Sequence, residues 1–241
     1  ITPAPYSAPA AYYVPNVSRI SSVEVLKGPS ATAYGPHTVG GAINFASLAI
    51  PDSGSGGFAD LSLGSDGFYK VQGSYGGNSG DFGFLLDLLT YGAEGFKEID
   101  KIDQETGFDR NDFGLKLSYA IPESRFDHRV TLLMEAGDEE ADETYLGLSD
   151  DDFRDTPNRR YPASQLAKFS SQHYNAVLNY SASLGKFNAT NIKVYWNKFD
   201  RSWNKLDRFW RGPALQRILQ MPDQYQMYYS ILTGERDSAE S

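Results

Sequence analysis

The chain has 241 residues and a formal net charge of −9, with no cysteine, 23 glycines, 16 tyrosines and 14 phenylalanines. The acidic balance argues against a nucleic-acid-binding protein, which needs a basic surface. No apolar run of about 18 residues is present, so the sequence offers no candidate transmembrane helix. A strand that crosses a membrane needs only about 9–11 residues of alternating polarity, and a composition rich in glycine and tyrosine suits such strands.

The first part of the chain predicts short strands separated by turns. Residues 1–16 are rich in proline, alanine and tyrosine, which indicates irregular or polyproline-like backbone. Strands are then expected at residues 17–27, 41–47, 58–63 and 69–75. The first of them ends at the turn pair Gly28-Pro29.

From residue 81 onward, polarity alternates strictly along the chain. Further strands are predicted at residues 81–91, 111–121, 128–137, 174–184 and 187–199. In the second of these, Phe113, Leu115, Leu117 and Tyr119 share one face, whereas Gly114, Lys116, Ser118 and Ala120 share the other. The small or polar second face indicates a wet interior rather than the dry core of a β-sandwich.

The connections between these strands alternate in length. Long polar segments occupy residues 92–110, 138–169 and 201–241, whereas tight turns occupy residues 121–125 and 183–186. Transmembrane barrels combine short periplasmic turns with longer extracellular loops, whereas soluble sandwiches have short loops at both ends. The sequence therefore predicts an all-β chain that forms part of a transmembrane antiparallel barrel, with a soluble β-rich protein as the alternative.

The glycine-rich stretch RISSVEVLKGPSATAYGPHTVGGAIN is not a phosphate-binding loop. Gly28 and Gly35 are seven residues apart and no lysine follows either, which excludes the Walker A spacing. The dinucleotide fingerprint GxGxxG is also absent. Part of the role of these glycines is to permit tight turns with positive φ.

The same stretch resembles the plug signature of TonB-dependent outer-membrane receptors. The matching residues are Glu24, Val25, Gly28, Pro29, Tyr34, Gly35, Gly40, Gly41 and Asn44. Ser22 departs from the arginine that many members have before the glutamate, and Arg19 lies where the ferric citrate receptor subgroup has one. Residues 4–15 and 143–165 are also similar to that subgroup, so the resemblance extends over most of the chain.

The resemblance implies an outer-membrane barrel of about 22 strands with a globular plug in its lumen. We expect residues 1–79 to be the C-terminal part of the plug and residues 80–241 to be the first part of the barrel, with about five strands. The chain would then be a fragment that lacks the signal peptide, the TonB box, the first half of the plug and most of the barrel.

By the same resemblance, the whole receptor would take up a ferric siderophore, with ferric citrate or a similar carboxylate chelate as the expected ligand. Its partners would be the TonB–ExbB–ExbD complex, the siderophore and outer-membrane lipid or lipopolysaccharide, with no cofactor and no directly bound metal. A receptor of the same fold for another siderophore, a cobalamin or a glycan is one alternative. A soluble β-rich binding module is another.

Arginine suits an anionic chelate because its planar fork pairs with carboxylates. The candidate ligand contacts are Arg159 and Arg160 in one loop, and Arg201, Arg208 and Arg211 in another, beside Trp203, Phe209 and Trp210. The alternative is that these arginines are solvated loop charges. On the plug, Tyr34, His37 and Thr38 could face the ligand from below, although packing within the plug would also explain Tyr34.

Nothing in the sequence resembles a catalytic set, because His37, His128 and His173 are scattered and the chain has no cysteine. The acidic run at residues 137–155 lacks the glycine position of an EF-hand loop. It predicts a solvated extracellular surface rather than a cation site, and contact with lipopolysaccharide through divalent cations would give the same composition. Residues 213–232 predict a short helix within a loop, interrupted by Pro222.

Overall fold

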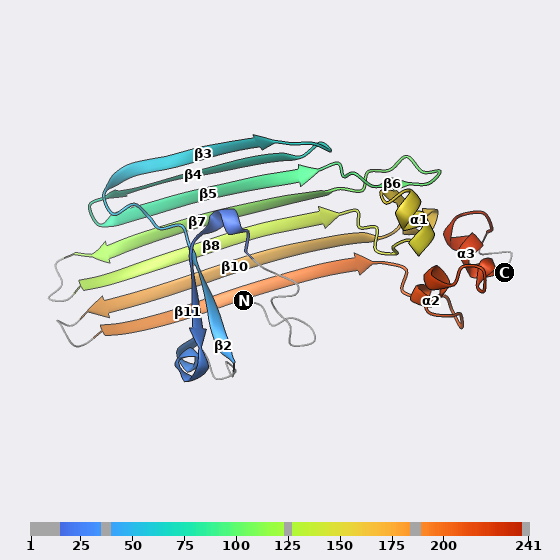
Figure 1. Ribbon diagram of the computed structural model, residues 1–241. Helices are drawn as coiled ribbons and strands as arrows, with labels where there is room; N and C mark the ends of the chain where they lie inside the picture. The colour runs from blue at the N-terminus through green and yellow to red at the C-terminus, as the bar shows by residue number, and fades with distance from the viewer. Residues whose placement is uncertain (1–14, 35–39, 123–126, 184–188, 238–241) are drawn as a thin grey trace.

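The computed structural model describes residues 15–34, 40–122, 127–183 and 189–237. They form a small hairpin, a large antiparallel sheet and a group of loops at one end of that sheet (Figure 1). The hairpin lies across one face of the sheet (Figure 1), and because its sequence resembles the plug signature it is called the plug hairpin below. The sheet is called the wall.

The plug hairpin consists of β1 (Ile20–Lys27) and β2 (Gly41–Ser47), which pair antiparallel. Two short 3-10 helices flank β1, η3 (Val17–Arg19) before it and η4 (Gly28–Tyr34) after it. Gly28 has a φ of 73° at the point where β1 ends, a left-handed conformation that glycine adopts without strain. The two expected strands and the turn at Gly28 are therefore present, and the structure pairs the strands as a hairpin.

The wall has seven strands in the order β11-β10-β8-β7-β5-β4-β3. Their bounds are β3 (Gly54–Leu63), β4 (Tyr69–Ser79), β5 (Phe82–Ala93), β7 (Phe108–Ile121), β8 (Asp127–Ala141), β10 (Lys168–Ser183) and β11 (Ala189–Asn204). Each strand pairs only with the strands that precede and follow it along the chain within this sheet. The all-β antiparallel prediction is thus confirmed, and the five strands predicted from residue 81 onward are all present.

The wall begins earlier than the predicted change of domain at residues 79 and 80. Strands β3 and β4 continue the same sheet, because β4 pairs with β5 from Tyr69 opposite Gly92 to Ser79 opposite Phe82. The turn at Gly80, with a φ of 61°, is a tight hairpin connection rather than a domain linker. Residues 48–53 therefore connect the plug hairpin to the first strand of the wall.

The two faces of the wall differ in polarity, as the alternation predicted. Large apolar side chains are exposed on the outer face, among them Leu61, Leu88, Leu178 and Trp196. The inner face, which contacts the plug hairpin, carries buried polar groups such as Gln72, Asp87, Asp112 and His173. An apolar outer face and a polar inner face are the pattern of a membrane barrel. Within the described ranges, no helix is long and apolar enough to cross a membrane.

The long connections gather at one end of the wall, called the loop end (Figure 1). They contain β6 (Glu98–Ile99), α1 (Asp150–Asp155), β9 (Arg159–Arg160), η5 (Pro162–Ser164), α2 (Leu215–Gln220) and α3 (Gln226–Leu232). Strands β6 and β9 pair in parallel and so join two of the loops. The helix predicted at residues 213–232 is present as two short helices with Pro222 between them.

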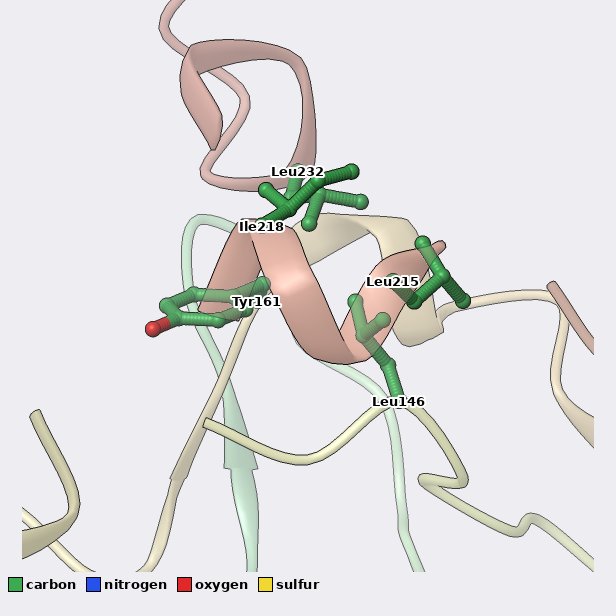
Figure 2. Packing of buried hydrophobic residues seen from close by; sticks show 5 residues of the cluster. All are labelled: Leu146, Tyr161, Leu215, Ile218 and Leu232. Carbon is green, nitrogen blue, oxygen red and sulfur yellow. The ribbon is translucent and has the colours of Figure 1, made fainter. Parts of the chain in front are cut away.

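These loops share a hydrophobic core, and together they are called the loop cluster. Its fully or nearly buried members are Leu146, Tyr161, Leu215, Ile218 and Leu232 (Figure 2). They come from the segment between β8 and β10 and from the segment after β11. Each fully buried aliphatic side chain contributes about 1.5–3 kcal/mol, so the loops are held together by packing as well as by polar contacts.

Candidate functional site

The inner face of the wall holds the plug hairpin through the side chain of Arg19. Asn16 caps η3 by accepting a hydrogen bond from the Ser18 N–H at 2.9 Å, and this helix ends at Arg19. The Arg19 guanidinium lies among three carboxylates on adjacent strands of the wall, Asp87 of β5, Asp112 of β7 and Glu135 of β8.

The geometry of this cluster is that of a buried charge network. The Arg19 Nε donates to Asp87 Oδ1, while Nη1 lies 3.5 Å from Asp112 Oδ1 and Nη2 lies 3.6 Å from Glu135 Oε1. Only 10% of the Arg19 side chain is exposed. A buried charge is stable only when it is paired and hydrogen-bonded, and the three strands provide that pairing together.

Gly114 makes room for the guanidinium. It lies between Asp87 and Glu135, opposite Asp87 in the β5–β7 register and opposite Glu135 in the β7–β8 register. A Cβ at residue 114 would collide with Nη2 of Arg19. The missing side chain thus forms a slot in the wall, called the Gly114 slot below, with a carboxylate on each side.

Two further contacts fix the plug hairpin to the wall. The Lys116 Nζ donates to Ser47 Oγ at 2.9 Å and to the Leu48 carbonyl at 2.6 Å. The Gln72 Nε2 donates to the Ser18 carbonyl at 2.8 Å. Both ends of the plug hairpin are therefore attached to the wall by polar side chains that originate on the inner face.

A second row of charges lies next to this cluster on the inner face, nearer the loop end. The Arg110 Nε lies 3.1 Å from Asp112 Oδ2, and its Nη1 lies 3.3 Å from Glu139 Oε2. Across the strands, Ser171 is opposite both Glu139 and Arg201. Of the sequence-predicted arginines, Arg201 therefore lies on the inner face of the wall, in the same row as Arg110.

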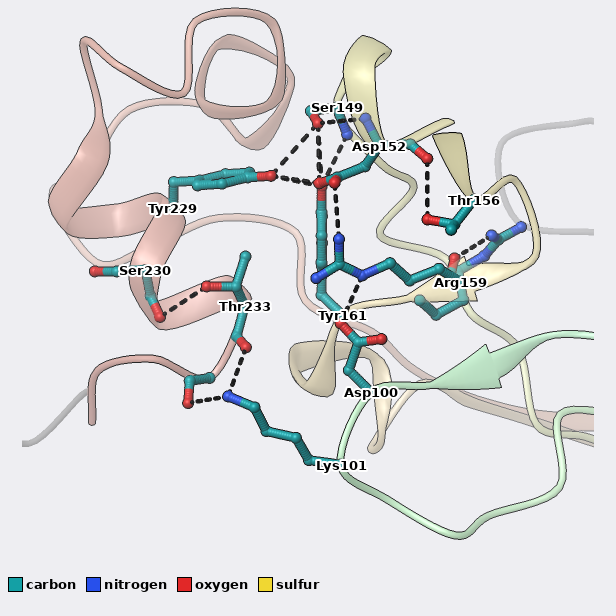
Figure 3. A network of polar contacts seen from close by, with 12 residues as sticks. Asp100, Lys101, Ser149, Asp152, Thr156, Arg159, Tyr161, Tyr229, Ser230 and Thr233 are labelled. Carbon is teal, nitrogen blue, oxygen red and sulfur yellow. Dashed lines mark hydrogen bonds and ion pairs between the residues drawn. The ribbon is translucent and has the colours of Figure 1, made fainter. Parts of the chain in front are cut away.

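The other predicted arginines divide into two groups. Arg159 is committed to internal ion pairs, with Nε 2.7 Å from Asp100 Oδ2 and Nη1 2.7 Å from Asp152 Oδ1 (Figure 3). Arg160 donates to Thr144 Oγ1 at 3.2 Å and to the Pro157 carbonyl at 2.8 Å. Both side chains therefore help to hold the loop cluster together.

Arg208 and Arg211 are instead exposed on a tight turn. The turn is closed by an isolated β-bridge between Arg208 and Ala214, and Arg211 has a φ of 56°. Trp210 lies between the two arginines and is 89% exposed. This turn presents two guanidinium groups and an indole ring to solvent at the loop end.

Asp152 is the polar centre of the loop cluster (Figure 3). Its Oδ2 accepts hydrogen bonds from the hydroxyls of Tyr161, Tyr229 and Ser149, while Oδ1 pairs with Arg159. Burial opposes ionisation of Asp152, but the bonds from Tyr161, Tyr229 and Ser149 and the charge of Arg159 outweigh it and hold the pKa below the ordinary value. The same burial, together with the neighbouring Asp152, raises the pKa of Tyr161.

The plug-signature residues occupy structural positions in the hairpin. Glu24 is opposite Asn44, and Lys27 is opposite Gly41. Gly41 has a φ of 154°, and a Cβ there would lie 2.6 Å from the Leu26 carbonyl oxygen. Gly35, His37, Thr38 and the side chain of Tyr34 lie outside the described residues, so the predicted ligand contacts of the plug remain predictions.

Sequence reasoning missed the carboxylates that receive Arg19. Asp87, Asp112 and Glu135 were not singled out, although each occupies an inner-face position of a strictly alternating strand, where charge is unusual unless it is paired. An acidic residue at such a position was therefore the signal by which these partners could have been found. Among the described residues, no group of three or more His, Asp or Glu side chains is arranged to hold a metal ion.

Comparison with known proteins finds two transporters that are similar to parts of this chain. No family model matches the chain. It is 32% identical over 107 residues to the vitamin B12 transporter BtuB of Photobacterium profundum, a match that covers 43% of this chain and 16% of that protein. The iron transporter FrpB of Neisseria meningitidis, F5-1 variant in its apoprotein form, shares the fold with a TM-score of 0.56 at 16% identity.

The FrpB match covers 78% of this chain and 29% of that structure. The chain thus spans less than a third of either similar protein. The names of both similar proteins describe transporters, and the FrpB structure shows a fold that this chain shares.

Proposed function

We propose that this chain is the plug-contact portion of a TonB-dependent outer-membrane receptor that takes up an anionic iron chelate, with ferric citrate or a similar carboxylate chelate as its ligand. The observation that carries the proposal is the Arg19 cluster, which fixes a hairpin to the polar inner face of a wall whose outer face is apolar. A plug held in this way closes a lumen in which a ligand can be captured and later released.

The arginines at the loop end support an anionic ligand. Arg208 and Arg211 are exposed on one turn, and Arg201 lies on the inner face of the wall. Arginine binds carboxylates with two parallel hydrogen bonds. Arg159 and Arg160 bind groups within the loop cluster. We assign ligand contact first to Arg208 and Arg211, which are exposed, and to Arg201 because of its place on the inner face.

Release of the chelate would require the TonB–ExbB–ExbD complex, which the plug signature implies. The apolar outer face would contact the acyl chains of the outer membrane and of lipopolysaccharide. His37, Thr38 and Tyr34 of the plug would meet the ligand from the periplasmic side.

Uptake of radioactive iron by the full-length receptor tests the proposal. A strain that depends on this receptor should accumulate iron from ferric citrate, and deletion of TonB should abolish the uptake. The Arg208→Ala/Arg211→Ala double variant should reduce uptake at low chelate concentration by about tenfold or more, because two charge-assisted contacts are lost. Arg154→Ala is the matched control, since Arg154 is 73% exposed in the same group of loops and pairs only locally with Asp151.

Normal TonB-dependent uptake of ferric citrate by the double variant would remove the arginine assignment. Absence of uptake by the unaltered receptor would remove ferric citrate as the ligand.

A cobalamin is the second candidate ligand, because the sequence similarity is to a vitamin B12 transporter. Binding of cyanocobalamin to the purified full-length receptor separates the two. Saturable binding of cyanocobalamin that ferric citrate does not displace would favour the cobalamin receptor.

A further inference from the structure

Asp112 is shared between the plug and the wall. Its Oδ1 faces Arg19 of the plug hairpin at 3.5 Å, and its Oδ2 pairs with Arg110 of the wall at 3.1 Å. Its side chain is only 4% exposed, so water does not screen either contact. The two arginines therefore compete for one buried carboxylate.

The acids around this carboxylate outnumber the guanidinium groups. Four acids lie in three successive rows of the inner face, namely Asp87, Asp112, Glu135 and Glu139, and Lys116 adds a positive charge beside Glu135. Arg19 and Arg110 are the two guanidinium groups that pair with them there. Arg110 therefore neutralises part of the negative charge of Asp112 and Glu139, which would otherwise attract Arg19. Arg110 lies on the side of Asp112 nearer the loop end.

The Gly114 slot makes the position of Arg19 sensitive to this balance. The guanidinium is held between Asp87 and Glu135 without a side chain beneath it, because a Cβ at residue 114 would collide with it. Its attachment therefore depends on electrostatic attraction in a poorly solvated place, where the strength of attraction follows the local charge closely.

We propose that Arg110 is a positioning residue that sets how firmly the wall holds the plug, and that an anion bound at the loop end tightens this hold by drawing Arg110 away from Asp112. Arg110 acts on Arg19 through Asp112, the carboxylate that both arginines contact. The part played by the anionic ligand rests on the proposed function. The bound ligand would thus keep the plug closed beneath it until the energising complex pulls the plug.

Hydrogen exchange of the plug hairpin, measured by mass spectrometry on the full-length receptor in lipid nanodiscs, tests the first step without a ligand. In Arg110→Gln, amides of β1 and β2 should exchange about five- to tenfold more slowly, since Asp112 and the uncompensated negative charge then act on Arg19 alone. Arg110→Lys should restore exchange toward that of the unaltered receptor, because it keeps the positive charge.

Glu139→Gln should act in the opposite direction. It removes the second partner of Arg110, which then pairs more fully with Asp112, and it removes one negative charge near Arg19. The plug amides should exchange faster. Arg129→Gln is the control, because Arg129 lies on the same face of β8 and donates to Ser118 at 3.5 Å, away from the cluster. It should leave the plug hairpin unchanged.

The sign of the change distinguishes this role from structural damage. A variant that merely disturbs the wall would accelerate exchange, whereas Arg110→Gln is expected to slow it. Unchanged or faster exchange in Arg110→Gln overturns the proposal.

Ferric citrate is the probe for the second step. It should slow exchange of the plug hairpin in the unaltered receptor and have no further effect in Arg110→Gln. An equal slowing in both would overturn the ligand step. No effect in the unaltered receptor would count against ferric citrate as the ligand, and the variants would still decide the role of Arg110.

Discussion

Two charges organise this molecule, and they are held in different ways. Arg19 of the plug hairpin lies among three carboxylates from three strands of the wall. Asp152 of the loop cluster accepts from three neutral hydroxyls and pairs with one arginine. The partners of Arg19 are all charged, whereas most partners of Asp152 are neutral hydroxyls.

This difference makes the contact of Arg19 with the wall adjustable by nearby charges, whereas the contacts of Asp152 within the loop cluster are fixed. Neutral hydroxyl donors satisfy Asp152 at short range without creating a field that other charges compete for. The carboxylates around Arg19 are shared with Arg110 and respond to it. We therefore expect the loop cluster to behave as one rigid unit and the plug contact to respond to the charges at the loop end.

The largest expected effect comes from removing the central charge of the plug contact. Arg19→Ala leaves three carboxylates facing one another and should weaken docking of the plug hairpin by about 3–5 kcal/mol. Hydrogen exchange of β1 and β2 in the full-length receptor measures it. Arg19→Lys should recover only part of the loss, because it keeps the charge but not the planar fork. Exchange unaffected by Arg19→Ala would mean that Lys116 and Gln72 hold the hairpin by themselves.

A smaller effect is expected at the centre of the loop cluster. Asp152→Asn keeps the shape but loses the charge-assisted hydrogen bonds, so protection of residues 142–167 and 205–232 should fall by about 1.5–3 kcal/mol. Asp151→Asn is the control, since Asp151 is on the same helix and its side chain is 90% exposed. The two segments should lose protection together. Loss confined to one segment would contradict a single rigid loop cluster.

Tyr229→Phe removes one of the hydroxyl donors to Asp152 and keeps the ring, whose centroid lies 5.7 Å from that of Tyr161. We expect a loss of about 1 kcal/mol in the protection of the same two segments. Because Tyr161 and Ser149 still donate to Asp152, the loss should be clearly smaller than in Asp152→Asn. An equal loss in both variants would show that the hydroxyls act as a unit.

Acid should produce the smallest and most selective change. The pKa of Asp152 is held below its ordinary value of 3.8 by its hydrogen-bond donors and Arg159, against the effect of burial. A depressed carboxyl pKa stabilises the fold fully above pH 3.8 and loses that contribution as the pH falls through the lower pKa of the folded state. The difference in protection factor between the unaltered receptor and Asp152→Asn should therefore shrink only below pH 3.8. A difference that already shrinks near pH 6 would contradict this assignment.

The sequence was sufficient to predict the wall, because a strand with one apolar and one polar face repeats its pattern every second residue. It was insufficient for β3 and β4, which were predicted as strands but assigned to the plug. Glycines such as Gly57 and Gly73 dilute the apolar face there, and a linker rich in glycine and serine precedes them. Strands β3 and β4 belong to the wall because β4 pairs with β5, and the polarity of a short segment does not indicate which strand it pairs with.

The candidate site was harder to predict for a related reason. The arginines of both loops were recognisable as loop charges, but only the fold separates Arg159, which binds Asp100 and Asp152, from Arg208, which faces solvent. The partners of Arg19 come from residues 68 to 116 positions further along the chain. Such contacts depend on how the plug hairpin lies on the wall, and no local pattern encodes them.

The order of strands in the wall also has a consequence for how the sheet assembles. Since each strand pairs with its predecessor, the wall can grow by adding one hairpin at a time. The entropy of loop closure rises only with the logarithm of loop length, so the long segments between β5 and β7 and between β8 and β10 slow this growth little. Contacts that are local in sequence favour rapid folding. Formation of the Arg19 cluster, which joins distant parts of the chain, is therefore expected to come last.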